Sequence, residues 1–217
     1  MTAAVRPLCR IAVLAASLAW SMPAIAHPHV FVTMHADLVY GPNGALVAVQ
    51  HAWTFDDAYS SYAVMGLPQK TRGVFSREEL APLAQVNVQS LKDYNYFTYP
   101  KVNGRTVRNV FLDPVDYWME WKDEALILHF TLPTKTPIAG KAIEVEIYDP
   151  EFLVDLAFNS DNPVSLLNAP ASCTVQASRP HSLNITAAQR ADPNFIISEA
   201  YVGMGADFAS RIDVQCP

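Results

Sequence analysis

The sequence has few charged residues and no cluster of basic ones. Its 217 residues include 15 lysines and arginines against 21 aspartates and glutamates, and the basic residues are scattered along the chain. A nucleic-acid footprint or a polybasic membrane patch needs several positive charges on one face. We therefore expect no nucleic acid among its partners.

The common catalytic motifs are also missing. The chain has no G-x-S-x-G, no H-E-x-x-H, no C-x-x-C and no glycine loop of the kind that cradles phosphate. Asp149, in "YDPEF", is followed by proline, which is typical of a turn rather than of a catalytic acid. We assign no catalytic residue, and the sequence favours a non-enzymatic role.

No apolar run is long enough to span a membrane comfortably. Residues 11–20 form a short apolar segment after Arg6 and Arg10, and small residues follow at 24–26. This order is typical of a cleaved secretory signal, whereas a spanning helix needs about 20 apolar residues. We expect residues 1–26 to be a signal peptide and residues 27–217 a single exported, periplasmic domain. Cleavage would make His27 the first residue and change the net charge from −6 to −8, because both arginines leave.

Only three cysteines are present, and Cys9 lies in the expected signal peptide. Cys173 and Cys216 remain in the exported part, where an oxidising compartment favours pairing. We expect a structural disulfide between them.

The hydrophobic pattern predicts a mainly β (α+β) fold. Alternation of apolar and polar residues favours a β-sandwich-like arrangement of short strands with one inserted helix. Ser76 and Glu79 form a capping-box pattern at the start of that helix, near residues 76–93, and residues 58–75 read as irregular. Residues 178–210 read as a long excursion that the disulfide closes. The expected strands lie near residues 27–40, 45–55, 95–102, 116–121, 125–133, 141–149, 172–178 and 210–216.

The first two strands read as a hairpin around the turn 41–44. If Tyr40 faces Ala45, paired residue numbers sum to 85, so that His29 lies opposite Asp56; a slip of one residue exchanges Asp56 for Asp57. Under either register, one carboxylate reaches the histidine end of the first strand.

A chain that begins at His27 offers its α-amino nitrogen and its imidazole to one metal ion. His29 adds a second imidazole from the same strand face, and Asp56 or Asp57 adds an oxygen. Pro28 has no N–H to lose, which excludes the square-planar site built from deprotonated amides. The donor set suits zinc, nickel, cobalt or copper, and His51 is a further candidate ligand.

Two alternatives stay open. One is a histidine brace that holds copper for oxidative chemistry, which needs a second histidine from a distant segment, such as His51 or His129. The other is a structural or interaction module in which the histidines are incidental.

Several segments together resemble a known family: "AHPHVFV", "HAWTFDDAYS", "LKDYNYFTY", "LHFTLP", "YDPEF" and the late cysteine pair. The family is the periplasmic component of uncharacterised bacterial transport systems of the ABC type, a domain of unknown function found beside nickel/cobalt permeases. The resemblance implies a role in transition-metal transport or homeostasis, with an inner-membrane metal permease as partner.

Members of this family look as if they carry a calcium loop before the helix, which here aligns with residues 68–79. The first ligand positions hold Pro68, Lys70 and Arg72, which supply no side-chain oxygen. We therefore expect no calcium at this loop.

Overall fold

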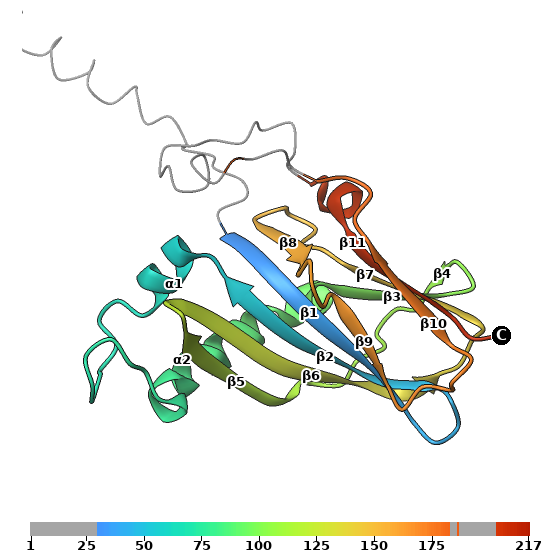
Figure 1. Ribbon diagram of the computed structural model, residues 1–217, viewed down its shortest axis with the longest axis horizontal. Coiled ribbons are helices and arrows are strands. Elements are labelled where there is room, and N and C mark those ends of the chain that lie inside the picture. Colours follow the sequence, from blue (N-terminus) through green and yellow to red (C-terminus); the bar gives the residue numbers. More distant parts are fainter. Residues whose placement is uncertain (1–29, 183–185, 187–202) are drawn as a thin grey trace, which may run out of the picture.

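The computed structural model describes residues 30–182, 186 and 203–217, and it shows two facing β-sheets with helices at one end (Figure 1). The first sheet has the order β5-β6-β2-β1-β8, and β9 also pairs with β1. The second has the order β10-β11-β7-β3-β4. The mainly β, sandwich-like prediction is confirmed.

The strands of the first sheet are β1 (Val30–Tyr40), β2 (Leu46–Phe55), β5 (Val115–Lys122), β6 (Ala125–Ile138), β8 (Val154–Phe158) and β9 (Val164–Leu167). Those of the second are β3 (Thr98–Val102), β4 (Arg105–Thr106), β7 (Ala142–Ile147), β10 (Thr174–Ser178) and β11 (Ser210–Gln215). The helices are α1 (Asp57–Ala63) and α2 (Arg77–Ser90), with 3-10 turns η1 (Lys92–Phe97) and η3 (Gly205–Phe208).

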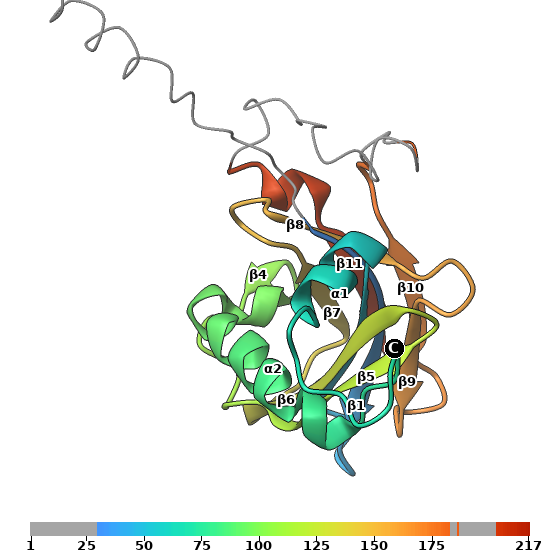
Figure 2. The ribbon, with the colours of Figure 1, turned by 90° about the vertical axis from the view of Figure 1, so that its left-hand side faces the viewer.

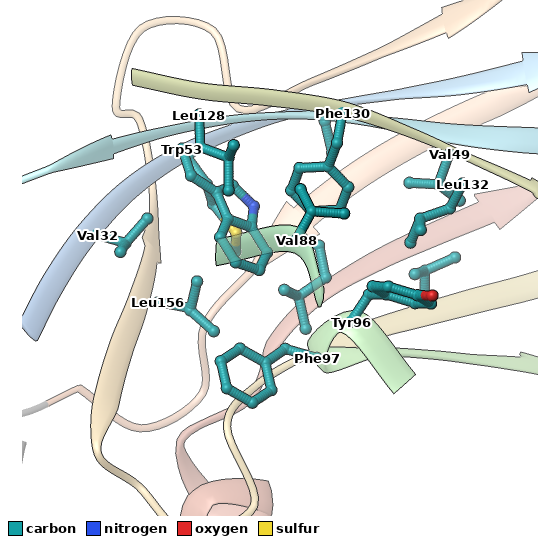
Figure 3. Packing of buried hydrophobic residues seen from close by; sticks show 14 of the residues in the cluster. Val32, Val49, Trp53, Val88, Tyr96, Phe97, Leu128, Phe130, Leu132 and Leu156 are labelled. Atoms are coloured by element: carbon teal, nitrogen blue, oxygen red, sulfur yellow. The ribbon is translucent and has the colours of Figure 1, made fainter. Parts of the chain in front are cut away.

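The core lies between the two sheets, where alternate strand residues point inward. Trp53 from β2 is 2% exposed, and its ring meets Phe130 edge-on at 4.9 Å between centroids. On its other side the indole stacks with Phe97 of η1 at 6.2 Å (Figure 3). Fully burying an aliphatic or aromatic side chain contributes about 1.5–3 kcal/mol, so each buried side chain of this layer stabilises the fold by about that amount.

The β1–β2 hairpin has a different register from the predicted one. Paired residue numbers sum to 87 from Val32 to Val39, and the pairing shifts between Val39 and Tyr40. Tyr40 faces Leu46 because the turn closes through Gly41 and Ala45, which leaves an irregularity beside it. The predicted sum of 85 is wrong by two residues. A shift of two keeps every side chain on its predicted face, since the strand period is two.

Helix α2 follows the predicted cap. The Ser76 hydroxyl accepts the N–H of Glu79 and the Glu79 carboxylate accepts the N–H of Ser76, which completes the capping box. The helix continues through Pro82 and packs on β5. The prediction that residues 58–75 are irregular is wrong at their start, because α1 occupies Asp57–Ala63 with Asp56 as its N-cap.

Strands β8 and β9 were not predicted. Both pair in parallel with β1, β8 from Val30 to Met34 and β9 from Ala36 to Val39. Asp155, 3% exposed, interrupts the apolar pattern of β8, and its carboxylate pairs with Arg179. A charged residue in a short strand breaks the apolar alternation that predicts the strand. The strand can then be predicted only if the ion-pair partner of the charged residue is known.

The expected disulfide is present between Cys173 and Cys216, which are 43 residues apart. It joins the start of β10 to the end of β11, two antiparallel neighbours. No helix in the described part of the chain is both long enough and apolar enough to cross a membrane.

Replacement of both Cys173 and Cys216 by serine should lower the free energy of unfolding by about 4 kcal/mol. The reason is that the bond closes a 43-residue loop, which restricts the unfolded chain. Urea unfolding of the variant and the wild type measures the difference. A loss below about 1 kcal/mol would show that the bond does not constrain the unfolded state in this way.

Candidate functional site at the start of the first strand

Strand β1 begins between α1 and β8 (Figure 1). The metal candidates His27 and His29 lie outside the described residues, so the geometry of the site starts at Val30 and Phe31. What the structure describes is the strand end that follows the two histidines in the sequence.

Asp56 anchors this strand end. Its Oδ2 accepts the N–H of Phe31 at 2.7 Å, and its own N–H donates to the Phe31 carbonyl at 2.9 Å. Its Oδ1 accepts the N–H of Tyr59 at 2.8 Å as the N-cap of α1. The carboxylate therefore lies beside Phe31, two residues from His29. Each oxygen has capacity for a second interaction, because a carboxylate oxygen has two lone pairs.

Asp57 lies in the first turn of α1 and is exposed. Of the two carboxylates that the sequence predicts near this strand end, Asp56 bonds to Phe31. Its predicted proximity to His27 and His29 stays a prediction, because both histidines lie outside the described residues. Asp57 is placed next to it on the solvent side.

On the opposite edge of β1, a tight loop over residues 149–153 fixes the strand. The Asp149 carboxylate, in a residue only 2% exposed, accepts the N–H groups of Glu151, Leu153 and Val154. The Leu153 carbonyl then accepts the N–H of Val30 at 3.3 Å. Asp149 is thus a turn-forming residue, as the Asp-Pro pattern indicated.

A buried ion pair involves β8, the strand that follows this loop. Asp155 is the parallel partner of Phe31, and its carboxylate is bound by the guanidinium of Arg179 through two nitrogens. The Nε of Arg179 also donates to the carbonyl of Phe208 in η3. Sequence analysis singled out neither residue, since the two are 24 positions apart and no local pattern joins them.

The absence of a side chain at Gly205 lets η3 approach the loop over residues 149–153 closely. A Cβ on Gly205 would lie 1.8 Å from the Asp149 carbonyl oxygen, closer than any side chain tolerates. The last segment of the chain therefore packs directly on the loop that holds Val30.

His51 lies in the core, away from the start of β1. It is 3% exposed, and its ring stacks on Phe130 at 4.8 Å. Its Nδ1 accepts the N–H of Trp53 at 3.3 Å, and its Nε2 lies 3.1 Å from the Thr98 hydroxyl. Because that hydroxyl donates to the Tyr96 carbonyl, Nε2 must be the donor to it. Both nitrogens of a neutral ring are thus engaged.

The structure does not bring His51 to the candidate site, and the same holds for His35 and His129. His35 bonds to the Asn162 carbonyl at 2.8 Å and to Asp37 at 2.9 Å. His129 stacks on Trp118 of β5 at 4.0 Å, on the face of β6 opposite to the buried Leu128 and Phe130. Among the residues that the structure describes, no group of three or more His, Cys, Asp or Glu side chains is arranged to hold a metal ion.

The segment that aligns with a calcium loop is engaged in local contacts. Glu79, which would be the last ligand, accepts the N–H groups of Lys70 and Ser76. Gly73 has φ of 78° and donates its N–H to the Gln69 side chain.

The pKa of His51 is lowered to about 3, first by burial and then by the charge of His35. The unfolded chain, with an ordinary pKa of about 6.5, therefore binds more protons than the folded chain between these values. The contribution of neutral His51 to the free energy of unfolding is complete above about pH 6.5. It decreases as the pH falls below that value, by up to about 1.4 kcal/mol per pH unit. Between pH 6.5 and pH 5 the wild type should lose about 2 kcal/mol more than His51→Gln.

Urea unfolding at a series of pH values measures this. His181→Gln, which removes an exposed histidine, should retain the wild-type pH dependence. Equal losses in the wild type and His51→Gln would show that His51 is not the titrating group.

Asp56→Ala should lower the free energy of unfolding by about 2–3 kcal/mol, because it removes a helix cap and a charged acceptor for the strand end. Asp57→Ala is the matched control and should cost less than about 1 kcal/mol, since its carboxylate is exposed. Hydrogen exchange of the Phe31 amide should accelerate only in Asp56→Ala. Equal stability of the two variants would contradict the anchoring role.

Comparison with known proteins identifies a family for the chain but no activity. No curated protein and no solved structure matches it. A family model does match, over residues 12–216, which is nearly the whole chain. The chain belongs to the family described as "Protein of unknown function (DUF1007)".

Proposed function

We propose that the exported protein binds one divalent transition metal at its N-terminal end and serves a metal transport or homeostasis system. The observation that carries the proposal is the double anchor of β1. The Asp56 carboxylate holds Phe31 on one edge, and the Leu153 carbonyl holds Val30 on the other. His29 directly precedes Val30 in the sequence, so the proposal brings its imidazole to the strand end that Asp56 anchors.

The donor set follows from this placement. His27, as the first residue, supplies an amine and an imidazole; His29 supplies a second imidazole; Asp56 or Asp57 supplies an oxygen. Such a mixed nitrogen and oxygen set suits zinc, nickel, cobalt or copper. Metal affinity should decrease as the pH falls through about 6.5, because the imidazoles and the amine must be deprotonated to bind.

The histidine-brace alternative needs a second histidine at the same end. In the structure the ring of His51 is buried with both nitrogens engaged, and the ring of His129 is stacked on Trp118. These positions favour a binding role over copper-dependent oxidation.

The place of the protein in the cell is part of the same proposal. A disulfide that joins the ends of a 43-residue loop is consistent with an oxidising compartment such as the periplasm. There the protein would capture the metal or present it to an inner-membrane permease. The sequence resemblance to the periplasmic components of transport systems supports this assignment.

The test uses mature protein purified from the periplasm. Native mass spectrometry reports the first residue and any bound metal together, and zinc titration against a chromophoric chelator gives the affinity. We expect a mass that starts at His27, one metal equivalent, and at least about tenfold weaker binding in His27→Ala and in His29→Ala.

Two matched variants sharpen the result. His181→Ala, at an exposed histidine elsewhere, should bind like the wild type. One alanine added before His27 should weaken binding as much as His27→Ala does, because the chelate ring needs a terminal amine. A mature protein that binds none of the four metals more tightly than about 1 mM would contradict the proposal.

A further inference from the structure

Helices α1 and α2 lie near each other at one end of the molecule (Figure 2). Residues of both helices line an open groove of about 580 Å³. Tyr59 and Asn87 form its floor, where the tyrosine hydroxyl donates to the Asn87 Oδ1 at 2.9 Å. The Asn87 amide donates in turn to the Leu83 carbonyl at 2.9 Å. Because these polar groups already have partners, the groove offers an occupant mainly apolar contact.

Apolar side chains stand out from the same face. Tyr62 is 74% exposed, Met65 75% and Val86 60%, and all three line the groove. They are the three most exposed large apolar side chains in the described part of the chain. An apolar patch next to a groove on a water-soluble domain marks an interaction surface more often than a scattered apolar residue does.

This face also differs from the rest of the chain in charge. No Asp, Glu, Lys or Arg occurs from residue 58 to residue 69, or from residue 80 to residue 91. The whole chain carries a net charge of −6. Two copies of a negatively charged chain repel each other least where their uncharged faces meet.

We propose that this face binds the same face of a second copy of the chain. One surface carries both the projecting Tyr62 and Met65 and the groove that can receive them, which is the condition for a two-fold, self-complementary contact. The inference does not depend on metal binding, and the two can be tested separately.

The size of the face predicts a weak dimer. Helix α2 has 14 residues. At 1.5 Å per residue it is about 21 Å long, whereas α1, with 7 residues, is about 10 Å long. Each helix is about 10 Å wide, so the two together present roughly 300 Å² per copy. A stable interface buries about 800 Å² per partner, so we expect a weak, transient dimer.

Sedimentation velocity of the metal-free mature protein tests the proposal over about 1–500 µM. The sedimentation coefficient of the wild type should rise with concentration toward that of a dimer. Met65→Glu and Tyr62→Glu should remain monomeric throughout, because they place negative charges in an apolar contact. Both side chains are about three-quarters exposed, so the fold should tolerate the change, which circular dichroism checks.

Leu112→Glu is the matched control. Leu112 is 49% exposed, and its backbone is bonded to Pro133 of β6, whereas α1 contacts β6 at Leu126. Seven strand residues separate these points by about 23 Å. The control should therefore dimerise like the wild type.

Amide spectra recorded at low and high concentration locate the contact. Shifts confined to residues 59–65 and 83–90 are expected. A wild type that stays monomeric over the whole range, a dimer that Met65→Glu leaves intact, or shifts at another surface would each overturn the proposal.

Discussion

Strand β1 is bonded along both edges, and the rest of the first sheet depends on this. Its antiparallel edge meets β2 for most of its length, while its parallel edge meets β8 and then β9. Parallel pairing makes the segment after β7 return to the edge of this sheet beside β1. That return places the loop with Asp149, and the disulfide-closed segment packed on it, against the first residues of the strand.

Three buried polar side chains near β1 and between the sheets, those of His51, Asp149 and Asp155, each have hydrogen-bond or ion-pair partners. His51 receives one hydrogen bond and donates another, Asp149 accepts three backbone N–H groups, and Asp155 is matched by Arg179. A buried polar group that loses its partner costs about 1–3 kcal/mol, and more if it is charged. These pairings therefore select one arrangement of β1, β8 and η3 over alternatives with the same apolar core.

Much of the fold is present in the sequence because its signals are local. Alternation locates most of the strands, Ser76 and Glu79 locate the start of α2, and the two cysteines outside the expected signal peptide define the disulfide. The missed β8 and the missed α1 have a common cause: a contact that helps to decide each one is distant in the sequence. Asp155 reads as a strand breaker until Arg179 is found beside it, and α1 depends on a cap, Asp56, that also bonds to β1.

The candidate site was predicted only in part for a related reason. The pattern "FDDAY" after a hairpin places a carboxylate near the strand start, and Asp56 is there. The predicted register was wrong by two residues because the irregularity at the turn leaves no trace in the alternation. For His51, a polar residue on the apolar face of a strand, the partners Trp53 and Thr98 decide its role, and Thr98 is 47 positions away.

The central claim is that a metal binds at the anchored start of β1. The most direct measurement is a series of amide spectra of the mature protein during addition of zinc. The account predicts that the amides of residues 30, 31, 56, 57 and 59 shift in proportion to one bound equivalent, while those of α2 stay unchanged. Shifts centred on any other part of the chain, or none at all, would contradict it.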